Sequence, residues 1–226
     1  MIKYDFSLYM NTDNSNSLII RNIKPSSKVL EFGCAHGRMT RYLKNMMGCD
    51  VFIVEKDLES GKSAAQFAKK YCIGDDGDIN NNIWQQKYAG EKFDFILFAD
   101  VLEHLYNPEA VLHSTKDFLN ENGSIWISIP NVSYNGVLID LLNDNFQYRE
   151  IGLLDNTHIR FFTSKSLEAM VSKCGFNIVK KLDPKNILCN SEFKNSYADV
   201  PPAVALFLAN RKDGEIYQFV WELKLK

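Results

Sequence analysis

Short apolar segments alternate with helix-like segments along most of this chain, and this alternation constrains the fold more than any other feature. Each apolar segment is bounded by turn or charged residues, as a buried strand is. Because strands that alternate with helices are joined by crossovers, the pattern predicts an α/β fold with a mostly parallel sheet. The expected strands are residues 28–32, 51–55, 71–74, 93–98, 124–129, 176–182 and 216–225.

The segments between these strands carry the spacing or the capping residues of helices. Asp57 is a candidate N-cap, and Pro108 stands where a helix tolerates proline best, in its first turn. Thr163 and Ser164 form a further candidate cap, and Gly175 follows as a stop signal. The expected helices are residues 37–47, 58–70, 108–122, 137–142 and 164–174.

The length allows one large domain or two very small ones, and the composition is ordinary for a soluble globular protein. The chain has 226 residues and a net charge of −2, which disfavours a role in coating nucleic acid. It shows no membrane-spanning apolar run and no secretory signal, and its five scattered cysteines suggest reduced thiols, so we expect a cytoplasmic protein. We expect a single domain over 1–226, with an N-terminal arm (1–24) and a substrate-side insertion (131–162) at the carboxyl edge of the sheet.

A glycine-containing turn joins the first strand to the first helix. Residues 31–37 read EFGCAHG, and a glycine there lets the backbone approach a ligand at the helix N-terminus. The dinucleotide fingerprint G-x-G-x-x-G is not met, because Ala35 and Arg38 occupy its second and third glycine positions. A nicotinamide-dependent oxidoreductase is therefore disfavoured.

The segment VLEFGCAHG at 29–37 resembles motif I of class I S-adenosylmethionine (SAM)-dependent methyltransferases, with Ala35 in place of the middle glycine. This resemblance implies a Rossmann-like seven-stranded sheet, mostly parallel with an antiparallel C-terminal strand, and SAM as cofactor, with S-adenosylhomocysteine (SAH) as product. It places Glu55 at the ribose hydroxyls and Asp75 near the adenine amino group, with Asp76 and Asp78 as close rivals of Asp75. The cofactor-binding residues it implies are Glu31, Gly33, Cys34, Ala35, His36, Gly37, Glu55, Lys56, Asp75, Asp76, Ala99, Asp100 and Leu102.

Three further segments resemble a bacterial subgroup of these enzymes that is associated with surface-polysaccharide and nucleotide-sugar pathways. They are DVLEHL at 100–105, SIPNV at 128–132 and GLLDNTHIRFFT at 152–163. The resemblance implies a small-molecule or glycan-precursor acceptor, such as a sugar or the methyl phosphoramidate decoration of a capsule. It implies neither a nucleic-acid nor a membrane partner, and it leaves the oligomeric state open.

Two histidines are candidates for the chemistry. Methyl transfer to a hydroxyl requires a base near the transition state, and histidine titrates in the right range. His158 is the first candidate because it lies in the insertion, and His104 follows the fourth strand. Asp155, Thr157 and Arg160 are candidate substrate-binding residues, although Arg160 also suits a structural ion pair.

No metal site is expected from the spacing of cysteines and histidines. The leading hypothesis is thus a SAM-dependent methyltransferase acting on O or N of a small polar acceptor. The alternative is a SAM-binding partner or regulatory protein without chemistry of its own.

Overall fold

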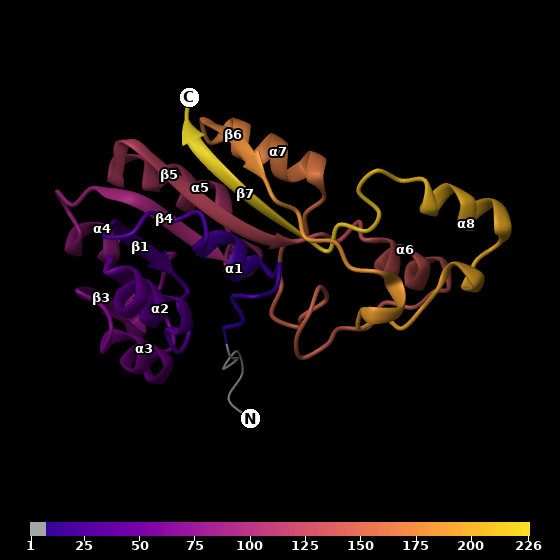
Figure 1. Cartoon of the computed structure of the whole chain (residues 1–226), viewed down its shortest axis with the longest axis horizontal. Helices are drawn as coiled ribbons and strands as arrows, with labels where there is room; N and C mark the ends of the chain where they lie inside the picture. The colour runs from indigo at the N-terminus through magenta and orange to yellow at the C-terminus, as the bar shows by residue number, and fades with distance from the viewer. Residues whose placement is uncertain (1–7) are drawn as a thin grey trace.

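The computed structural model describes residues 8–226, and its centre is a seven-stranded sheet in the order β3-β2-β1-β4-β5-β7-β6 (Figure 1). Strands β1 to β5 run parallel, whereas β7 pairs antiparallel with β5 and β6. The predicted mostly parallel sheet with an antiparallel C-terminal strand is confirmed. The strands are β1 (Lys28–Phe32), β2 (Asp50–Glu55), β3 (Lys70–Ile73), β4 (Phe93–Ala99), β5 (Leu119–Pro130), β6 (Phe176–Lys181) and β7 (Gln218–Leu225).

The central strands are buried because helices cover both faces of the sheet, which is why they are almost continuously apolar. Phe32 of β1 and Phe98 of β4 lie opposite each other in register, and their rings stack with centroids 4.6 Å apart. Contacts of this kind fix how the carboxyl ends of β1 and β4 align. The site described below is built at those ends.

The helices mostly fall where the sequence predicts them. Residue 57 caps α3 as expected, since the Asp57 side chain accepts a hydrogen bond from the backbone N–H of Ser60. Thr163 likewise caps α7 within a capping box. The helices are α1 (Ser15–Ile20), α2 (Arg38–Met47), α3 (Leu58–Ala65), α4 (Ile83–Lys87), α5 (Pro108–Ser114), α6 (Asn135–Leu142), α7 (Ser164–Lys173) and α8 (Pro202–Ala209).

Two predicted helices are too long, and strand pairing is the reason in both cases. The helix after Asp57 ends at Ala65, because Lys70 already pairs with Phe52 in the β2–β3 ladder. The helix that begins at Pro108 ends at Ser114 and a 3₁₀ turn follows, because Leu119 pairs with Phe93. Residues 119–123 therefore belong to β5. Ladder hydrogen bonds override the local helical pattern here.

Besides the two apolar clusters built on the strands of the sheet, a third lies beside the sheet and joins two segments that are distant in sequence. Residues 131–162 form it together with residues 183–216, so the predicted insertion is only half of this lobe. Figure 1 shows the lobe, with α6 and α8, extending away from the strands. Its buried residues include Tyr134, Leu153, Phe193 and Leu208.

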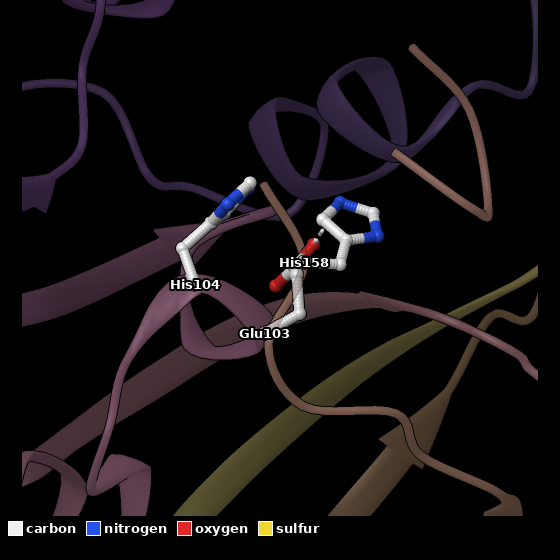
Figure 2. A group of neighbouring side chains, drawn as sticks. All are labelled: Glu103, His104 and His158. Atoms are coloured by element: carbon white, nitrogen blue, oxygen red, sulfur yellow. Dashed lines mark ion pairs between the residues drawn. The ribbon is translucent and has the colours of Figure 1, made fainter. Parts of the chain in front are cut away.

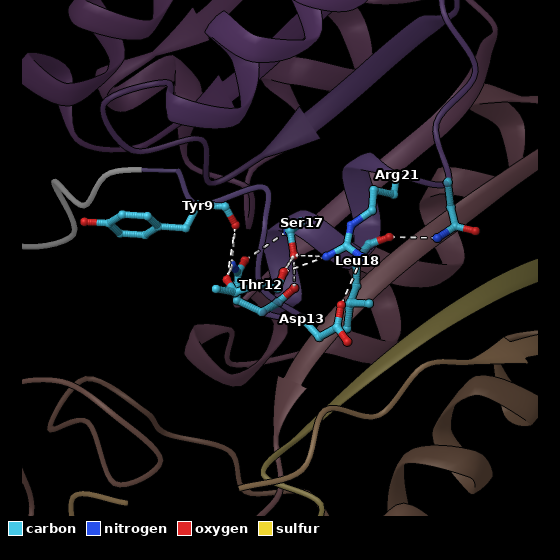
Figure 3. Close-up of polar contacts among 8 residues, drawn as sticks. Tyr9, Thr12, Asp13, Ser17, Leu18 and Arg21 are labelled. Carbon is cyan, nitrogen blue, oxygen red and sulfur yellow. Dashed lines mark hydrogen bonds and ion pairs between the residues drawn. The ribbon is translucent and has the colours of Figure 1, made fainter. Parts of the chain in front are cut away.

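The N-terminal arm is held by a polar network before α1 (Figure 3). Asn14 caps α1 by accepting from the N–H of Ser17, and the Arg21 guanidinium donates to the Thr12 carbonyl at 2.6 Å and pairs with Asp13 at 2.9 Å. The arm brings Asn16 to the wall of the main cavity. Residues 1–7 of the predicted arm lie outside the described part of the chain.

None of the helices within residues 8–226 has the length and apolar character needed to cross a bilayer.

Gly37 provides a stability prediction. Its φ of +77° is left-handed, and a Cβ there would lie 2.7 Å from the Cα of Ala64. We expect Gly37→Ala to lower the free energy of unfolding by about 3 kcal/mol, measured by chemical denaturation. Gly90→Ala is the matched control: its φ is +80° but nothing lies within 4 Å, so only the conformational cost of roughly 1 kcal/mol applies. Equal losses in the two variants would show that the contact with α3 is unimportant.

Candidate active site

The main cavity lies at the carboxyl ends of β1, β2 and β4 and has a volume of about 770 Å³. Its wall is formed by the glycine turn after β1, the end of β2, the segment after β4 and the loop around His158. This is the edge at which open α/β sheets bind ligands. The lobe contributes Ile151, Gly152 and Leu153 to the opposite wall.

The glycine turn after β1 adopts left-handed backbone conformations at three positions. Gly33, Ala35 and Gly37 have φ values of +64°, +47° and +77°. A Cβ on Gly33 would lie 2.6 Å from a methyl group of Val101, so a side chain there would displace the segment after β4. Ala35 holds a conformation that costs a residue with a side chain about 1–3 kcal/mol, and such strain gathers at functional sites.

The Glu55 carboxylate stabilises this turn. It accepts hydrogen bonds from the backbone N–H of Ala35 at 2.7 Å and of Asp57 at 2.8 Å. Burial raises its pKa, and these two N–H groups oppose the rise. A carboxylate has about four acceptor positions, so two remain for hydroxyl groups of a ligand.

Two further acids, the buried Glu31 and the half-buried Asp100, make this part of the cavity acidic. Burial raises the pKa of Glu31 to about 7, although Thr40 donates a hydrogen bond to it at 2.7 Å and Arg38 lies nearby. Burial also raises the pKa of Asp100, which accepts from the Ser128 hydroxyl at 2.7 Å. Asp100 has a φ of +57°, a second strained position on the cavity wall. A cationic ligand would relieve the desolvation of these carboxylates.

Of the three acids after β3, Asp78 is the one that lines the cavity. The sequence had suggested it only as an alternative for the acid near the adenine. Asp78 lines the cavity and pairs with Lys56 at 2.7 Å, whereas Asp75 and Asp76 do not line it. The 3₁₀ turn Gly74–Gly77 turns the chain after β3 and so decides which acid faces inward. A Cβ on Gly77 would lie 2.1 Å from the carbonyl oxygen of Glu55, so only glycine fits there.

Glu103, His104 and His158 come together where the segment after β4 meets the loop around His158, and all three line the cavity (Figure 2). Each offers one ligand atom, and these atoms lie within 4.8 Å of one another. The two imidazole rings meet edge to face, with centroids 4.7 Å apart. The backbone N–H groups of Ile159 and Arg160 both donate to the Glu103 carbonyl at 3.0 Å, which ties the His158 loop to the segment after β4.

The hydrogen bonds of both imidazoles define their tautomers. Nδ1 of His158 lies 3.1 Å from the carbonyl oxygen of Leu153, and Nδ1 of His104 lies 3.1 Å from the carbonyl oxygen of Thr157. A carbonyl oxygen only accepts, so in each neutral ring Nδ1 carries the proton and Nε2 carries the lone pair. Nε2 is therefore the basic atom of both rings.

Two of the three predicted substrate-binding residues line the main cavity, and the third does not. Asp155 and Thr157 line the cavity, and the Thr157 hydroxyl donates to the Asp155 carboxylate at 2.7 Å while lying 3.1 Å from Nδ1 of His104. They therefore orient His104. Arg160 instead lies in a neighbouring cavity of about 510 Å³ and donates to the Tyr106 carbonyl at 2.6 Å.

The structure brings most of the predicted cofactor residues to one wall and leaves others outside it. The predicted residues that line the cavity are Glu31, Gly33, Cys34, Ala35, Glu55, Lys56, Ala99 and Asp100. The predicted residues that do not line it are His36, Gly37, Asp75, Asp76 and Leu102. Leu102 is fully buried in the core, and His36 lies 3.5 Å from the Ser60 hydroxyl.

Sequence reasoning missed Glu103 as a site residue. A signal was available, because Glu103 is an acid inside the otherwise apolar segment VLEHL. A charged residue in a buried segment is seldom fully buried without a partner.

Comparisons with known proteins place the chain among methyltransferases. A family model described as "Methyltransferase domain" matches residues 11–181. A protein named ubiquinone biosynthesis O-methyltransferase, from Glaesserella parasuis serovar 5 (strain SH0165), is 26% identical over 155 residues, which are 61% of this chain. The match spans only 57% of that relative's own length.

Solved structures of methyltransferases share the fold. A SAM-dependent methyltransferase from Archaeoglobus fulgidus aligns with a TM-score of 0.63 and 17% identity, over 93% of this chain and 95% of that one. The magnesium protoporphyrin IX methyltransferase from Synechocystis PCC 6803, solved with bound SAH, aligns with a TM-score of 0.57 and 13% identity, over 92% of this chain and 78% of that one. At sequence identities of 17% and 13%, the similarity to these two proteins shows a shared fold alone.

Proposed function

The chain belongs to the methyltransferase-domain family, and on this basis we propose that it transfers a methyl group from SAM to a hydroxyl oxygen of a small acceptor. The observation that carries the proposal is one cavity whose two ends are lined by different chemical groups. One end holds the glycine turn and three acids with raised pKa values, and the other holds two oriented imidazoles.

The cofactor end fits SAM in charge and in hydrogen-bonding groups. When bound, SAM supplies an electrophilic methyl group on a sulfonium cation. Glu55 would accept the ribose hydroxyls with its remaining acceptor positions, and Glu31 and Asp100 would face the positively charged groups of the cofactor. Asp78 and Lys56 would lie toward the adenine.

The imidazole end suits removal of a proton from a hydroxyl. The oxygen must expose a lone pair for in-line attack, and a base within reach of its proton contributes about 10²–10⁴-fold to the rate. Nε2 of His158 is the proton acceptor we propose, with Nε2 of His104 as the second candidate. Positioning donor and acceptor in one cavity would supply most of the remaining acceleration.

The walls near the imidazoles favour an acceptor with an apolar or aromatic body. Leu105, Tyr106, Ile151 and Leu153 line this end, and Tyr106 and Ile151 are largely exposed. The name of the Glaesserella parasuis relative also describes transfer to oxygen. A sugar, nucleotide-sugar or capsule acceptor, as the bacterial subgroup resemblance implies, is the second candidate.

The direct test uses SAM carrying a tritiated methyl group and a panel of phenols, catechols, sugars and nucleotide sugars. We expect label to move to an aromatic hydroxyl and SAH to bind in calorimetry. Transfer only to sugars would favour the second candidate. SAH binding without transfer to any acceptor would favour the alternative of a regulatory SAM-binding protein, and no SAH binding would overturn the proposal.

A pH dependence of cofactor affinity follows from Glu31. Its pKa of about 7 means that it is largely protonated at pH 6 and ionised at pH 8, and only the carboxylate attracts a cation. We therefore expect the affinity for SAM, measured by calorimetry, to rise with pH, by up to about tenfold for each pH unit below 7. Glu31→Gln should bind more weakly with a flatter pH profile. An unchanged profile in that variant would contradict the assignment.

A further inference from the structure

Glu103 is a buried carboxyl group whose oxygens make no hydrogen bond to any described residue. Its exposed fraction is 1%, and neither carboxylate oxygen has a hydrogen-bond partner within residues 8–226. Glu31, Glu55 and Asp100 in the same cavity each accept at least one hydrogen bond. Isolated buried carboxylates are costly, and those that persist are paired or coordinate metals. A carboxyl group in this position is stabilised either by a proton or by a cationic partner.

The neighbouring imidazoles present the complementary ligands. Nε2 of His158 lies 3.9 Å from Oε1 of Glu103, which is too long for a hydrogen bond. In the neutral tautomer assigned above, Nε2 of His158 carries a lone pair, and so does an ionised Glu103 oxygen, so the two atoms repel each other unless a proton or a metal ion lies between them. Figure 2 shows the Glu103 carboxylate pointing toward the two rings, and the third ligand atom comes from His104.

The distances suit a metal ion. Protein oxygen and imidazole ligands bind transition metals at about 2.0–2.2 Å, so two ligands of one ion lie at most ~4.4 Å apart. The pair of His158 and Glu103 already meets this limit, and the whole set, within 4.8 Å, needs only a small rotation of side chains. The three ligand atoms thus lie nearly as close together as they would around a bound metal ion.

The surroundings of the imidazoles are also those of metal ligands. A ligating histidine usually donates its other N–H to a carbonyl or carboxylate, which fixes the ring. His158 donates to the Leu153 carbonyl. The Thr157 carbonyl accepts from His104, and the Thr157 hydroxyl, itself bonded to Asp155, lies beside the same nitrogen.

We propose that Glu103, His104 and His158 form a binding site for one divalent transition-metal ion on the acceptor side of the cavity. Two imidazoles and one carboxylate suit Zn²⁺, Mn²⁺, Fe²⁺ or Co²⁺ better than Ca²⁺ or Mg²⁺. Three protein ligands leave coordination positions open, which is typical of catalytic sites.

The role of the ion rests on the proposed function, whereas its binding does not. An acceptor hydroxyl that occupied an open position would have its pKa lowered, and its proton would pass to water. The ion and the proton compete for the same Nε2 lone pairs, so His158 acts as the base only in the metal-free protein. Transfer should therefore persist, more slowly, after removal of the metal.

The test is titration of Co²⁺ into the full chain after treatment with a chelator, followed by calorimetry and visible absorption. We expect one ion per chain and a spectrum of nitrogen and oxygen ligation. Glu103→Gln should weaken binding at least about 100-fold, and His104→Ala, which changes a partly exposed residue, provides a second variant. His113→Gln is the matched control, because His113 lies exposed on α5 away from the cluster.

The outcomes separate this proposal from the proposed function. Absence of Co²⁺ binding, or equal binding by wild type and Glu103→Gln, would overturn the metal site while leaving SAH binding and methyl transfer intact. Thermal melts of both variants establish that they are folded. Conversely, Co²⁺ binding that depends on Glu103 in a chain that binds no SAH would support the metal site and overturn the methyltransferase proposal.

Discussion

His158→Asn is expected to lower kcat by about 10²–10⁴-fold and to leave the affinity for SAM nearly unchanged. Asparagine keeps a hydrogen-bonding side chain but can neither accept a proton at neutral pH nor replace imidazole well as a metal ligand. His158 lies on the proposed acceptor side of the cavity, where its loop is tied to the segment after β4 through the Glu103 carbonyl. Steady-state kinetics and calorimetry on the same preparation measure both quantities.

Two controls interpret the result. His158→Ala should behave like His158→Asn, and His113→Asn should retain wild-type turnover because that residue lies outside the cavity. Near-normal turnover in His158→Asn would mean that the histidine only supports the loop, with His104 as the base or an acceptor that needs none. A tenfold loss of SAM affinity would place His158 in the cofactor site instead.

Glu55→Ala is expected to weaken SAM binding by more than about 1.5 kcal/mol, which is over tenfold. The carboxylate is proposed to bind the ribose hydroxyls, and it also accepts the N–H groups of Ala35 and Asp57. Its loss would therefore remove ligand contacts and release a strained turn, since Ala35 has a φ of +47°. Calorimetry with SAM and with SAH measures the effect.

Glu59→Ala is the matched control for this variant. Glu59 is also an acid near the start of α3, but it is exposed, and within residues 8–226 its ion pair is with Lys62 on the same helix, so affinity should not change. Glu55→Gln keeps one acceptor oxygen and should fall between the wild type and Glu55→Ala. Unchanged affinity in Glu55→Ala would remove Glu55 from the ribose role.

Local sequence patterns were sufficient to predict those strands and helix caps that depend on residues close together in the chain. The strands at β1, β2 and β4 and the caps at Asp57 and Thr163 are as predicted. The ends of α3 and α5 were predicted wrongly because Lys70 and Leu119 join strand ladders with distant partners. A helical pattern cannot reveal such pairing.

In the candidate site, too, some residues were predictable from the local sequence and others depended on contacts between distant segments. The glycine turn and Glu55 were predicted from the sequence, since the turn follows a strand and Glu55 ends the next one, and both contribute to the cavity wall. The choice of Asp78 over Asp75 and Asp76 depends on a 3₁₀ turn packed against the backbone of β2. The lobe could not be predicted either, because its cluster joins residues 131–162 to residues 183–216.

The sequence by itself determined the sheet, the family and the part of the cavity wall that holds the glycine turn and Glu55, because these depend on residues close together in the chain and on a short motif. Only the tertiary structure decided what surrounds Glu103, His104 and His158. Glu103 and His158 are far apart in sequence, and they meet because the N–H groups of Ile159 and Arg160 bind the Glu103 carbonyl. That contact places a buried carboxylate without hydrogen-bond partners among the described residues 3.9 Å from an imidazole nitrogen. Burial and tautomer are properties of the surroundings, and the surroundings exist only in the folded chain.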